Sequence, residues 1–258
     1  MTTGFSRRKM LASLVSGAST LLLAGCDRVT QSESFGTVLR NTEKLTMAGQ
    51  RLLLDRQSLA PEYSVADLSP VFRANGTQAP DSEEYNRLLE NDFADWRLQV
   101  DGLVQQPLSL SLAQLKSLPS RTQITRHDCV EGWSAIGQWQ GAPLGRILDL
   151  ARLKPGARYV VLHCADELEV TFDGSGRYYE SIDLLDAYHP QTILAYAMNG
   201  KDLPVAHGAP LRLRVERQLG YKQAKYLMRI EVVSSFDTLW GGRGGYWEDR
   251  GYEWYAGI

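Results

Sequence analysis

Apolar and polar residues alternate along several short stretches of this chain, which is the pattern of half-buried β-strands. The clearest case is 96–102, Trp-Arg-Leu-Gln-Val-Asp-Gly, which ends in a turn signal. The same pattern predicts strands at 123–125, 158–164, 193–198, 211–215 and 226–233. Strands this short and closely spaced, with scattered short helices, predict a mixed, β-rich α+β domain.

Helical spacing and capping residues predict the remaining elements. Ser111 is a capping residue for a helix over 111–118, and Gly141-Ala142-Pro143 opens a helix over 143–151. Further helical pieces are expected at 41–59 and 181–187. The tail, 234–258, is rich in Gly, Trp and Tyr, so we expect it to pack on the domain rather than to be disordered.

The first residues have the features of an export signal. Ser6-Arg7-Arg8-Lys9 is a twin-arginine pattern, and the apolar run after it ends in Leu23-Ala24-Gly25-Cys26, which looks like a bacterial lipobox. We expect 1–25 to be the signal peptide, Cys26 to be lipidated, 26–65 to be a tether and 66–258 to be the catalytic domain. A plain signal peptide is the alternative, and an amphipathic cytosolic helix is disfavoured because the run has no polar face. Twin-arginine export carries folded proteins, which is a first hint of a cofactor inserted in the cytoplasm.

Composition narrows the class of function only slightly. The 258 residues are 43% hydrophobic and 22% charged, with a net charge of −2, which gives no reason to expect a nucleic-acid partner. No Gly-x-Gly-x-x-Gly follows a predicted strand, so a dinucleotide-binding fold is not expected. Neither a P-loop nor a Gly-x-Ser-x-Gly motif is present.

Cys129 is the first candidate for chemistry, since it ends a predicted strand in a polar loop that we expect a helix to follow. It could be a nucleophile, a metal ligand or half of a disulfide with Cys164. Arg126, His127 and Asp128 flank it and could steer substrate or protons, or be surface charges. His163, His189 and His207 are the histidines that could pair with it in a hydrolase.

A basic stretch provides the second candidate. His207 to Arg214 and Leu219 to Tyr226 combine arginines, lysines and glycines with little acid to pair them. Arg grips phosphate through two N–H groups and Lys acts as a point charge, so the stretch could hold a phosphate. A solvated strand face is the alternative. A phosphate-bearing cofactor beside a soft thiolate ligand explains both candidates at once.

Together these motifs resemble a known family. Cys129-Val-Glu-x-Trp-Ser, Gly208-Ala-Pro-Leu-Arg-Leu and Gly220-x-Lys-x-x-Lys occur in the order found in the oxidoreductase molybdopterin-binding domain of the sulfite oxidase superfamily. The resemblance runs from about Ser69 to Val233. It is greatest to small periplasmic members that resemble methionine sulfoxide reductase catalytic subunits, and it implies a β-rich sulfite-oxidase-type fold.

The resemblance also implies a cofactor, one molybdenum on molybdopterin, and residues that hold it. Cys129 would ligate the metal, and the rest of the cofactor would contact Arg73, Asn75, Cys164, His207, Arg212, Gln223, Ala224 and Lys225. Cys164 stands where a relative has threonine. Independently of the resemblance, Phe72 is expected to anchor the turn-rich segment 67–80. Sulfite oxidases have arginines after the cysteine; here Glu131 would repel sulfite.

Three hypotheses follow. The first is a molybdenum enzyme that carries out two-electron redox or oxygen-atom transfer on a small molecule. It would be a monomer, lipid-anchored on the periplasmic face of the inner membrane, with a membrane-bound or soluble electron-transfer partner. The second is a metal-free Cys-His hydrolase or transferase. The third is a non-catalytic lipoprotein with a disulfide between Cys129 and Cys164.

Overall fold

The computed structural model describes the backbone from Glu33 and the side chains from Asn41, in both cases to Ile258. The chain divides into two compact units, Met1–Leu52 and Leu53–Ile258. The twin-arginine pattern, the apolar run and Cys26 lie outside the described residues, and so does the beginning of the tether. None of the helices in the described part is long and apolar enough to cross a membrane.

Within the first unit and just beyond it lies one long helix, α2, from Glu33 to Leu53. The sequence predicted a helix over 41–59, so the prediction was right about the element and wrong about both ends. The Asp55 carboxylate accepts a hydrogen bond from the Gln57 amide at 2.8 Å. An Asp side chain that bonds the backbone two residues on competes with helical hydrogen bonds, and this explains the earlier end.

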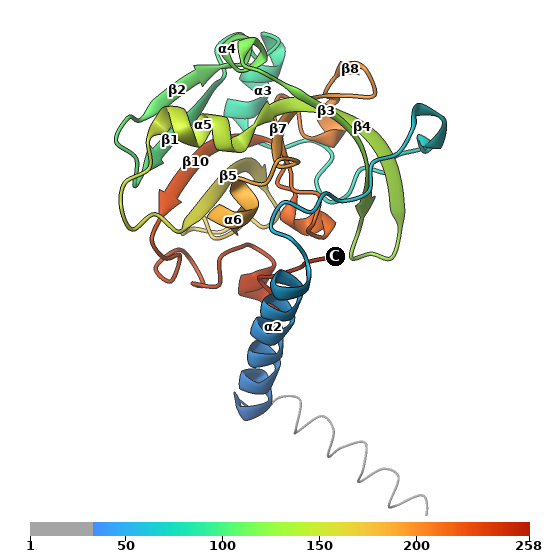
Figure 1. Ribbon diagram of the computed structural model, residues 1–258. Helices are drawn as coiled ribbons and strands as arrows, with labels where there is room; N and C mark the ends of the chain where they lie inside the picture. Colours follow the sequence, from blue (N-terminus) through green and yellow to red (C-terminus); the bar gives the residue numbers. More distant parts are fainter. Residues whose placement is uncertain (1–32) are drawn as a thin grey trace, which may run out of the picture. The chain divides into compact units, whose positions relative to one another are not determined.

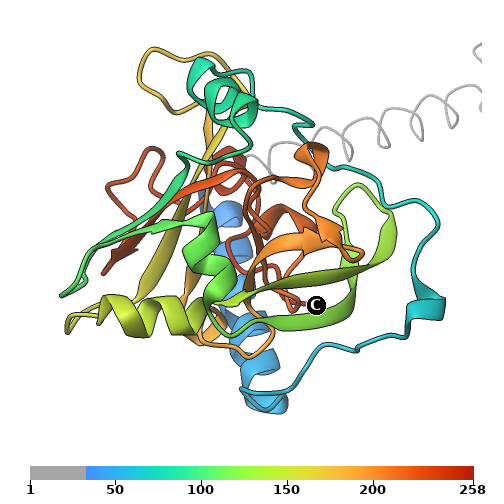
Figure 2. The ribbon, with the colours of Figure 1, turned by 90° about the horizontal axis from the view of Figure 1, so that it is seen from above.

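The second unit contains two five-stranded sheets (Figures 1 and 2). The first sheet has the order β2-β1-β10-β5-β6, with strands Leu108–Ser111, Arg97–Gly102, Leu227–Val233, Tyr159–Glu167 and Arg177–Asp183. The second has the order β3-β4-β7-β8, with strands Arg121–Asp128, Ser134–Pro143, Ile193–Met198 and Lys201–Asp202, and β9, Arg212–Arg214, also pairs with β7. Only the β1–β10 pairing is parallel among these named strands.

Short helices connect and cover the strands. They are η1 (Val65–Asp67), α3 (Glu83–Glu90), α4 (Leu112–Ser117), α5 (Leu144–Ala151), α6 (Leu184–Ala187), η2 (Val205–His207), η3 (Gly220–Lys222) and η4 (Glu248–Arg250). The predicted capping serine is confirmed, because the Ser111 hydroxyl accepts a hydrogen bond from the Gln114 amide at 3.1 Å.

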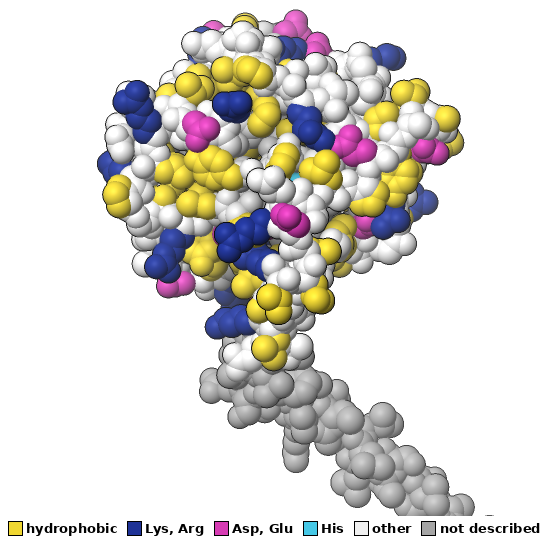
Figure 3. Space-filling view, viewed as in Figure 1, with side chains coloured by type: hydrophobic (Ala, Val, Ile, Leu, Met, Phe, Trp, Pro, Cys, Tyr) yellow, Lys and Arg dark blue, Asp and Glu magenta, His cyan; other side chains and the backbone are white. Residues whose placement is uncertain are grey.

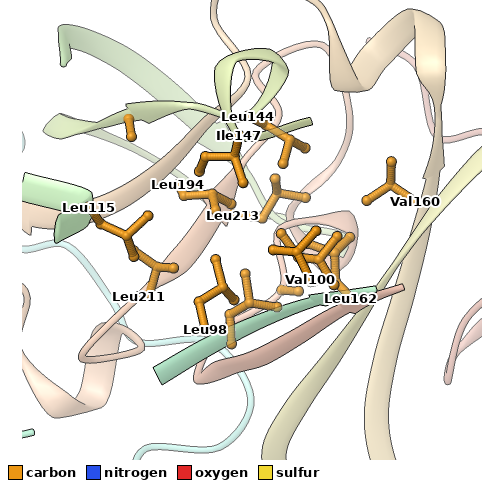
Figure 4. Close-up of a cluster of buried hydrophobic side chains, with 14 of the residues drawn as sticks. Leu98, Val100, Leu115, Leu144, Ile147, Val160, Leu162, Leu194, Leu211 and Leu213 are labelled. Atoms are coloured by element: carbon orange, nitrogen blue, oxygen red, sulfur yellow. The ribbon is translucent and has the colours of Figure 1, made fainter. Parts of the chain in front are cut away.

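The main hydrophobic core joins the two sheets. Leu98 and Val100 of β1 and Leu162 of β5 belong to the same buried cluster as Leu194 of β7 and Leu213 of β9 (Figure 4). Leu144 and Ile147 of α5 complete the cluster from a third direction. Because both sheets contribute inward side chains, the strands that carry the candidate residues are fixed relative to one another.

Two of the predicted elements were partly wrong. The polar loop after Cys129 is a tight hairpin turn, and β4 rather than a helix follows it; α5 comes only after β4. Ser181 to Asp183 belong to β6, so the helix predicted over 181–187 is only the four residues of α6. β2, β4, β6 and β8 were not predicted. In β4 a bulge at Gln140 and Gly141 interrupts the alternation of apolar and polar residues. Strand β8 is only two residues long, which is too short for such an alternation to be recognised.

The prediction for the tail is confirmed. Tyr246 is 2% exposed and Glu248 is fully buried, and the Trp254 indole donates to the Ser181 hydroxyl at 2.8 Å.

Figure 3 shows one face of the molecule, on which basic and acidic side chains are interspersed among apolar ones.

Candidate cofactor site around Cys129

Cys129 occupies the first position of the β3–β4 turn. Its amide donates to the Trp133 carbonyl at 2.9 Å, and the Gly132 amide donates to the Cys129 carbonyl at 3.0 Å. Gly132 has φ +84°, a backbone conformation that glycine adopts without strain. The turn holds Cys129 at 8% exposure, so its side chain is largely buried.

The environment of Cys129 does not by itself produce a thiolate. Burial raises the pKa of the thiol, and the nearby Glu131 carboxylate acts in the same direction. None of His163, His189 and His207 makes a hydrogen bond to Cys129 in the described part of the chain. A bound metal cation is the partner that would deprotonate this thiol, because a coordinating thiol loses its proton outright.

No disulfide joins the two described cysteines, since Cys129 and Cys164 are both free and buried. The Cys164 thiol lies in the main core, and burial followed by the charge of Asp166 raises its pKa well above the ordinary value. A thiol with a high pKa and no solvent access is a poor nucleophile.

The residues before Cys129 alternate between two environments along β3. His127 is fully buried, whereas Arg126 and Asp128 point outward and pair with each other at 3.0 Å. Ser134 donates to the other oxygen of Asp128 at 2.5 Å. Neither Arg126 nor Asp128 lines the pocket that Cys129 faces. Among the three flanking residues, the structure therefore brings only His127 to the buried side.

His127 is a neutral, buried histidine. Its Nδ1 lies 3.1 Å from a guanidinium nitrogen of Arg214, so Nδ1 accepts and the proton is on Nε2. Burial, then the charges of Arg214 and Arg212, lowers its pKa well below the ordinary value of 6.5. His127 thus ties the end of β3 to β9 and does not act as a base at neutral pH.

A pocket opens beside the Cys129 thiol. It has a volume of about 710 Å³, including space open to solvent. Its walls come from five segments that are distant in sequence. They are Asn75, Gly76 and Thr77; Cys129, Val130 and Glu131; Asp166, Leu168 and Tyr178; Tyr221 and Lys225; and Trp247 and Tyr252.

The basic stretch next to this pocket is buried, so its interpretation as a solvated face was wrong. Arg212 and Arg214 are 0% exposed, Lys222 is 1% and Lys225 is 6% exposed. Two of these cations have acidic partners: Arg214 pairs with Glu216 at 2.5 Å, and Lys222 pairs with Glu180 and with Glu248.

Arg212 and Lys225 are the two cations without such a partner, since no acid among the described residues lies within ion-pair distance of either. Arg212 donates to the carbonyls of His207 and Gln223, and its Nε has no hydrogen-bond partner. Burial and then the charge of Arg214 lower the Arg212 pKa to about 9. Trp139 lies under both guanidinium groups, 4.9 Å from Arg212 and 4.4 Å from Arg214.

Lys225 reaches the pocket wall and holds one of its loops. Its ammonium donates to the carbonyls of Asn75 at 2.7 Å and Ala206 at 3.1 Å, and to that of Thr77. Burial and then the charge of Arg212 lower its pKa to about 7. Because all three donors go to neutral carbonyls, Lys225 has no ion-pair partner, and Asp166 is the nearby acid whose charge acts on it through space.

Of the other residues predicted to contact the cofactor, only one lines the pocket. Asn75 lines it, whereas Arg73 is exposed and does not. His207 is half-buried, packs against Phe72 with ring centroids 5.6 Å apart, and has its pKa lowered to about 4 by burial and by Arg212. Gln223 and Ala224 are buried beside Arg212, and the Gln223 side-chain oxygen has no partner.

Phe72 is the anchor that the sequence predicted. Its ring lies 5.4 Å from Trp139 and 5.7 Å from His127, both measured between centroids. These contacts fix the chain just before Asn75 onto the second sheet.

Several pocket residues were missed by sequence reasoning. Asp166 is 4% exposed, one of its carboxylate oxygens has no partner, and burial raises its pKa to about 6. No local motif marks Asp166, because the strand pattern of β5 continues through it. Trp247 and Tyr252 come from the aromatic tail, whose composition predicted packing but not its position beside Cys129.

The residues around the pocket fit an anionic, metal-bearing cofactor. The Cys129 sulfur and the buried cation Lys225 line it, and polar atoms of two further lining residues, Asp166 and Thr77, have no hydrogen-bond partner. Outside the lining, Arg212 has no ion-pair partner, and polar atoms of Arg212 and Gln223 also lack a hydrogen-bond partner. A buried charge needs a partner, and a soft thiolate suits a high-valent or soft metal. The site therefore indicates an enzyme that depends on a metal-bearing cofactor.

Comparison with known proteins gives the family. Residues 86–240 match the oxidoreductase molybdopterin binding domain, and the chain belongs to this family. It is 37% identical over 252 residues to a putative protein-methionine-sulfoxide reductase subunit of Azospira oryzae, with coverage of 98% of this chain and 88% of the relative. The protein is thus a molybdenum-cofactor-dependent oxidoreductase with the mixed, β-rich sulfite-oxidase-type fold that the resemblance implied.

Two further similarities were found. The chain is 34% identical over 176 residues to the protein-methionine-sulfoxide reductase catalytic subunit MsrP of Xanthomonas axonopodis pv. citri, covering 66% of this chain and 54% of the relative. The chain thus spans about half the length of that relative. The crystal structure of the sulfane dehydrogenase SoxCD from Paracoccus pantotrophus aligns with a TM-score of 0.48 and 23% identity, covering 55% of this chain and 39% of that one.

Proposed function

We propose that this protein reduces methionine sulfoxide side chains in other proteins, with one molybdenum bound through the Cys129 thiolate. Two relatives that are 37% and 34% identical carry names that state this activity. They change the proposed substrate from a free small molecule to an oxidised side chain on a polypeptide. Both relatives are named as subunits, which implies that they work with a partner protein. We therefore propose that this protein has a membrane-bound or soluble electron-transfer partner.

One observation carries the proposal: the Cys129 thiol and the Lys225 ammonium line the same pocket. Cys129 would hold the metal, and Lys225 and Arg212 would compensate the negative charge of the cofactor's phosphate and sulfur ligands. Lys225 also holds the Asn75–Thr77 loop through backbone carbonyls. The polar atoms without partners beside Arg212 are the groups that the pterin end would contact.

The reaction combines one sulfoxide, two electrons and two protons to give one thioether and one water. When bound, the molybdenum cofactor supplies the two-electron exchange. The chain's own residues bind and orient the substrate and hold protons. Asp166 lines the pocket with a pKa raised to about 6 by burial, so it can hold and release a proton near neutral pH. Glu131 lines the same pocket and disfavours anions such as sulfite.

The experiment is an assay of purified protein whose molybdenum and pterin contents have been measured. Reduced viologen serves as electron donor, and N-acetylmethionine sulfoxide, a methionine-oxidised unfolded polypeptide and sulfite are the three substrates tested. We expect both sulfoxides to be reduced and sulfite to react poorly. Protein with full molybdenum content that reduces neither sulfoxide contradicts the proposal.

We also propose that the protein is exported folded through the twin-arginine pathway and anchored by lipid on Cys26, at the periplasmic face of the inner membrane. Two features of the sequence support this proposal: the twin-arginine pattern suits a protein whose cofactor is loaded in the cytoplasm, and Cys26 can carry the lipid of an anchor, which needs more than one acyl chain to be stable. Arg7→Lys with Arg8→Lys should leave precursor in the cytoplasm, whereas Cys26→Ala should leave uncleaved, non-acylated precursor. Acylation that survives Cys26→Ala would rule out this anchor.

A further inference from the structure

The loop between β5 and β6 presents two apolar side chains to solvent beside the pocket. Val170 is 97% exposed and Phe172 is fully exposed, although Leu168, two residues before Val170, lines the pocket wall. Figure 2 shows this loop projecting from the body of the domain beyond the strands. Exposed apolar residues are common singly, but two on one projecting loop at a pocket need an explanation.

Hydrogen bonds within the loop fix its shape. The Gly176 amide donates to the Thr171 hydroxyl at 2.8 Å, and the Leu168 amide donates to the Gly176 carbonyl at 2.8 Å. The Asp173 carboxylate accepts from the Ser175 amide at 3.0 Å. Because the backbone is closed on itself, Val170 and Phe172 are held outward by the fold of the loop.

The C-terminal tail is bound to this loop. Arg250 donates to Glu169 at 2.8 Å, and its guanidinium lies 3.6 Å above the Tyr246 ring. Trp247 and Tyr252, on either side of Arg250, are stacked with centroids 5.3 Å apart, and both line the pocket. The Arg250–Glu169 ion pair thus joins the tail to the loop, and we call the apolar side chains of the two segments, Val170, Phe172, Trp247 and Tyr252, the rim. The family match ends at residue 240, so the tail part of the rim lies outside the matched domain.

We propose that this rim is the docking surface for the polypeptide substrate: Trp247 and Tyr252 contact the oxidised methionine side chain, and Val170 and Phe172 contact apolar residues that flank it. The inference rests on the proposed function, and it assigns residues that recognise the chain around the reacting group. Methionines are mostly core residues with apolar neighbours, and sulfoxide formation disrupts cores. An oxidised segment thus exposes the apolar side chains that such a rim can bind.

Charge favours a polypeptide over a membrane surface. From Leu168 to Gly176 the loop carries Glu169 and Asp173 and no Lys or Arg. Segments that lie on anionic membranes combine apolar residues with basic ones, which this loop lacks. Glu131 adds a further carboxylate at the pocket, so a neutral or basic apolar peptide complements the rim.

The test compares a rim variant with a matched surface variant. Val170→Ser with Phe172→Ser changes two exposed side chains, so the fold should be retained. Leu59→Ser with Val65→Ser is the control, because these residues are 52% and 67% exposed and do not line the pocket. Molybdenum-loaded proteins are assayed on the oxidised polypeptide and on N-acetylmethionine sulfoxide. Equilibrium binding of the oxidised polypeptide is measured separately, without an electron donor.

We expect the rim variant to have a KM for the polypeptide about tenfold higher, and equally weaker binding, with unchanged kinetics on the small sulfoxide. The control should behave as wild type in all three measurements. A rim variant that binds and reduces the polypeptide as wild type does overturns the inference, even where sulfoxide reduction itself is confirmed. If the wild-type protein reduces neither sulfoxide, the proposed function is wrong. The binding measurement, which needs no activity, still tests whether the rim binds the polypeptide.

The same proteins are then incubated with phosphatidylcholine vesicles. Membrane association that is lost in the rim variant alone, with unchanged polypeptide binding, identifies the rim as a membrane contact and overturns the inference.

Discussion

The imidazole of His127 lies against the backbone of Gly220, so that a Cβ atom on residue 220 would be 2.5 Å from Nε2 and 2.6 Å from Cε1. On its other side His127 contacts Arg214, which pairs with Glu216. The strand that precedes Cys129, β3, is thereby packed onto the segment that carries Lys225. The position of Cys129 relative to the buried cations depends on this contact between a ring and a glycine.

Gly220→Ala should disturb this contact. Neither the buried ring nor the backbone can move away freely, so we expect a loss of stability of about 1–3 kcal/mol and a lower molybdenum content per protein. Urea unfolding and metal analysis measure the two effects. Gly49→Ala in α2 is the control, because a Cβ there meets nothing within 4 Å. An alanine variant with wild-type stability and full metal content would show that the contact does not position the site.

The fold class and the identity of the cofactor could be predicted from the sequence because both depend on local patterns. Cys129 with its following residues and the glycine–lysine spacing after 207 are contiguous motifs, and strands such as Ile193–Met198 have bounds set by short apolar runs. Contiguous motifs of this kind do not predict which segments that are distant in the sequence lie next to one another in the fold.

The arginines of β9 show where the sequence was ambiguous. The alternation in 211–215 predicted a strand but could not tell a solvated face from a buried one. Leu213 faces the main core, while Arg212 and Arg214 are buried on the other face over Trp139. Only the structure shows that Glu216, two residues further on, pairs with Arg214 and not with Arg212, and that Trp139 from a distant strand lies under both guanidinium groups.

Cys129→Ala should abolish activity without unfolding the protein. The side chain lies in a turn that is held by backbone hydrogen bonds, and alanine preserves these bonds. Without the thiolate, the metal should lose one sulfur from its coordination shell, which X-ray absorption at the molybdenum edge measures. An unchanged metal–sulfur shell in the alanine variant would contradict the assignment of Cys129 as ligand.

Lys225→Met and Lys222→Met should separate cofactor binding from folding. Lys222 lies between two buried carboxylates, so its loss leaves uncompensated charge and should cost about 3–5 kcal/mol of stability. Lys225 has only carbonyl partners, so its loss should affect the apoprotein less and lower cofactor affinity about tenfold or more.

Cofactor content and urea unfolding of both variants provide the test. If Lys225→Met retains full molybdopterin, or if Lys222→Met is as stable as wild type, the distinction between a cofactor cation and a structural cation is wrong.

The stability of the cofactor-free protein should rise with pH between about 7.5 and 9 because of Lys225. Burial and Arg212 lower its folded pKa to about 7 from an ordinary value of 10.5, so in this window the unfolded chain binds more protons than the folded chain. Stability increases with pH wherever that holds, here by up to roughly 1.4 kcal/mol per pH unit. Lys225→Met, which has no proton to lose at this position, should show a correspondingly smaller slope.

A bound phosphate would raise the Lys225 pKa again, so the molybdenum-loaded protein should also lack this part of the slope. Urea unfolding of the three proteins at pH 7.5 and pH 9 decides the matter: equal slopes in all three would mean that Lys225 does not titrate in this range.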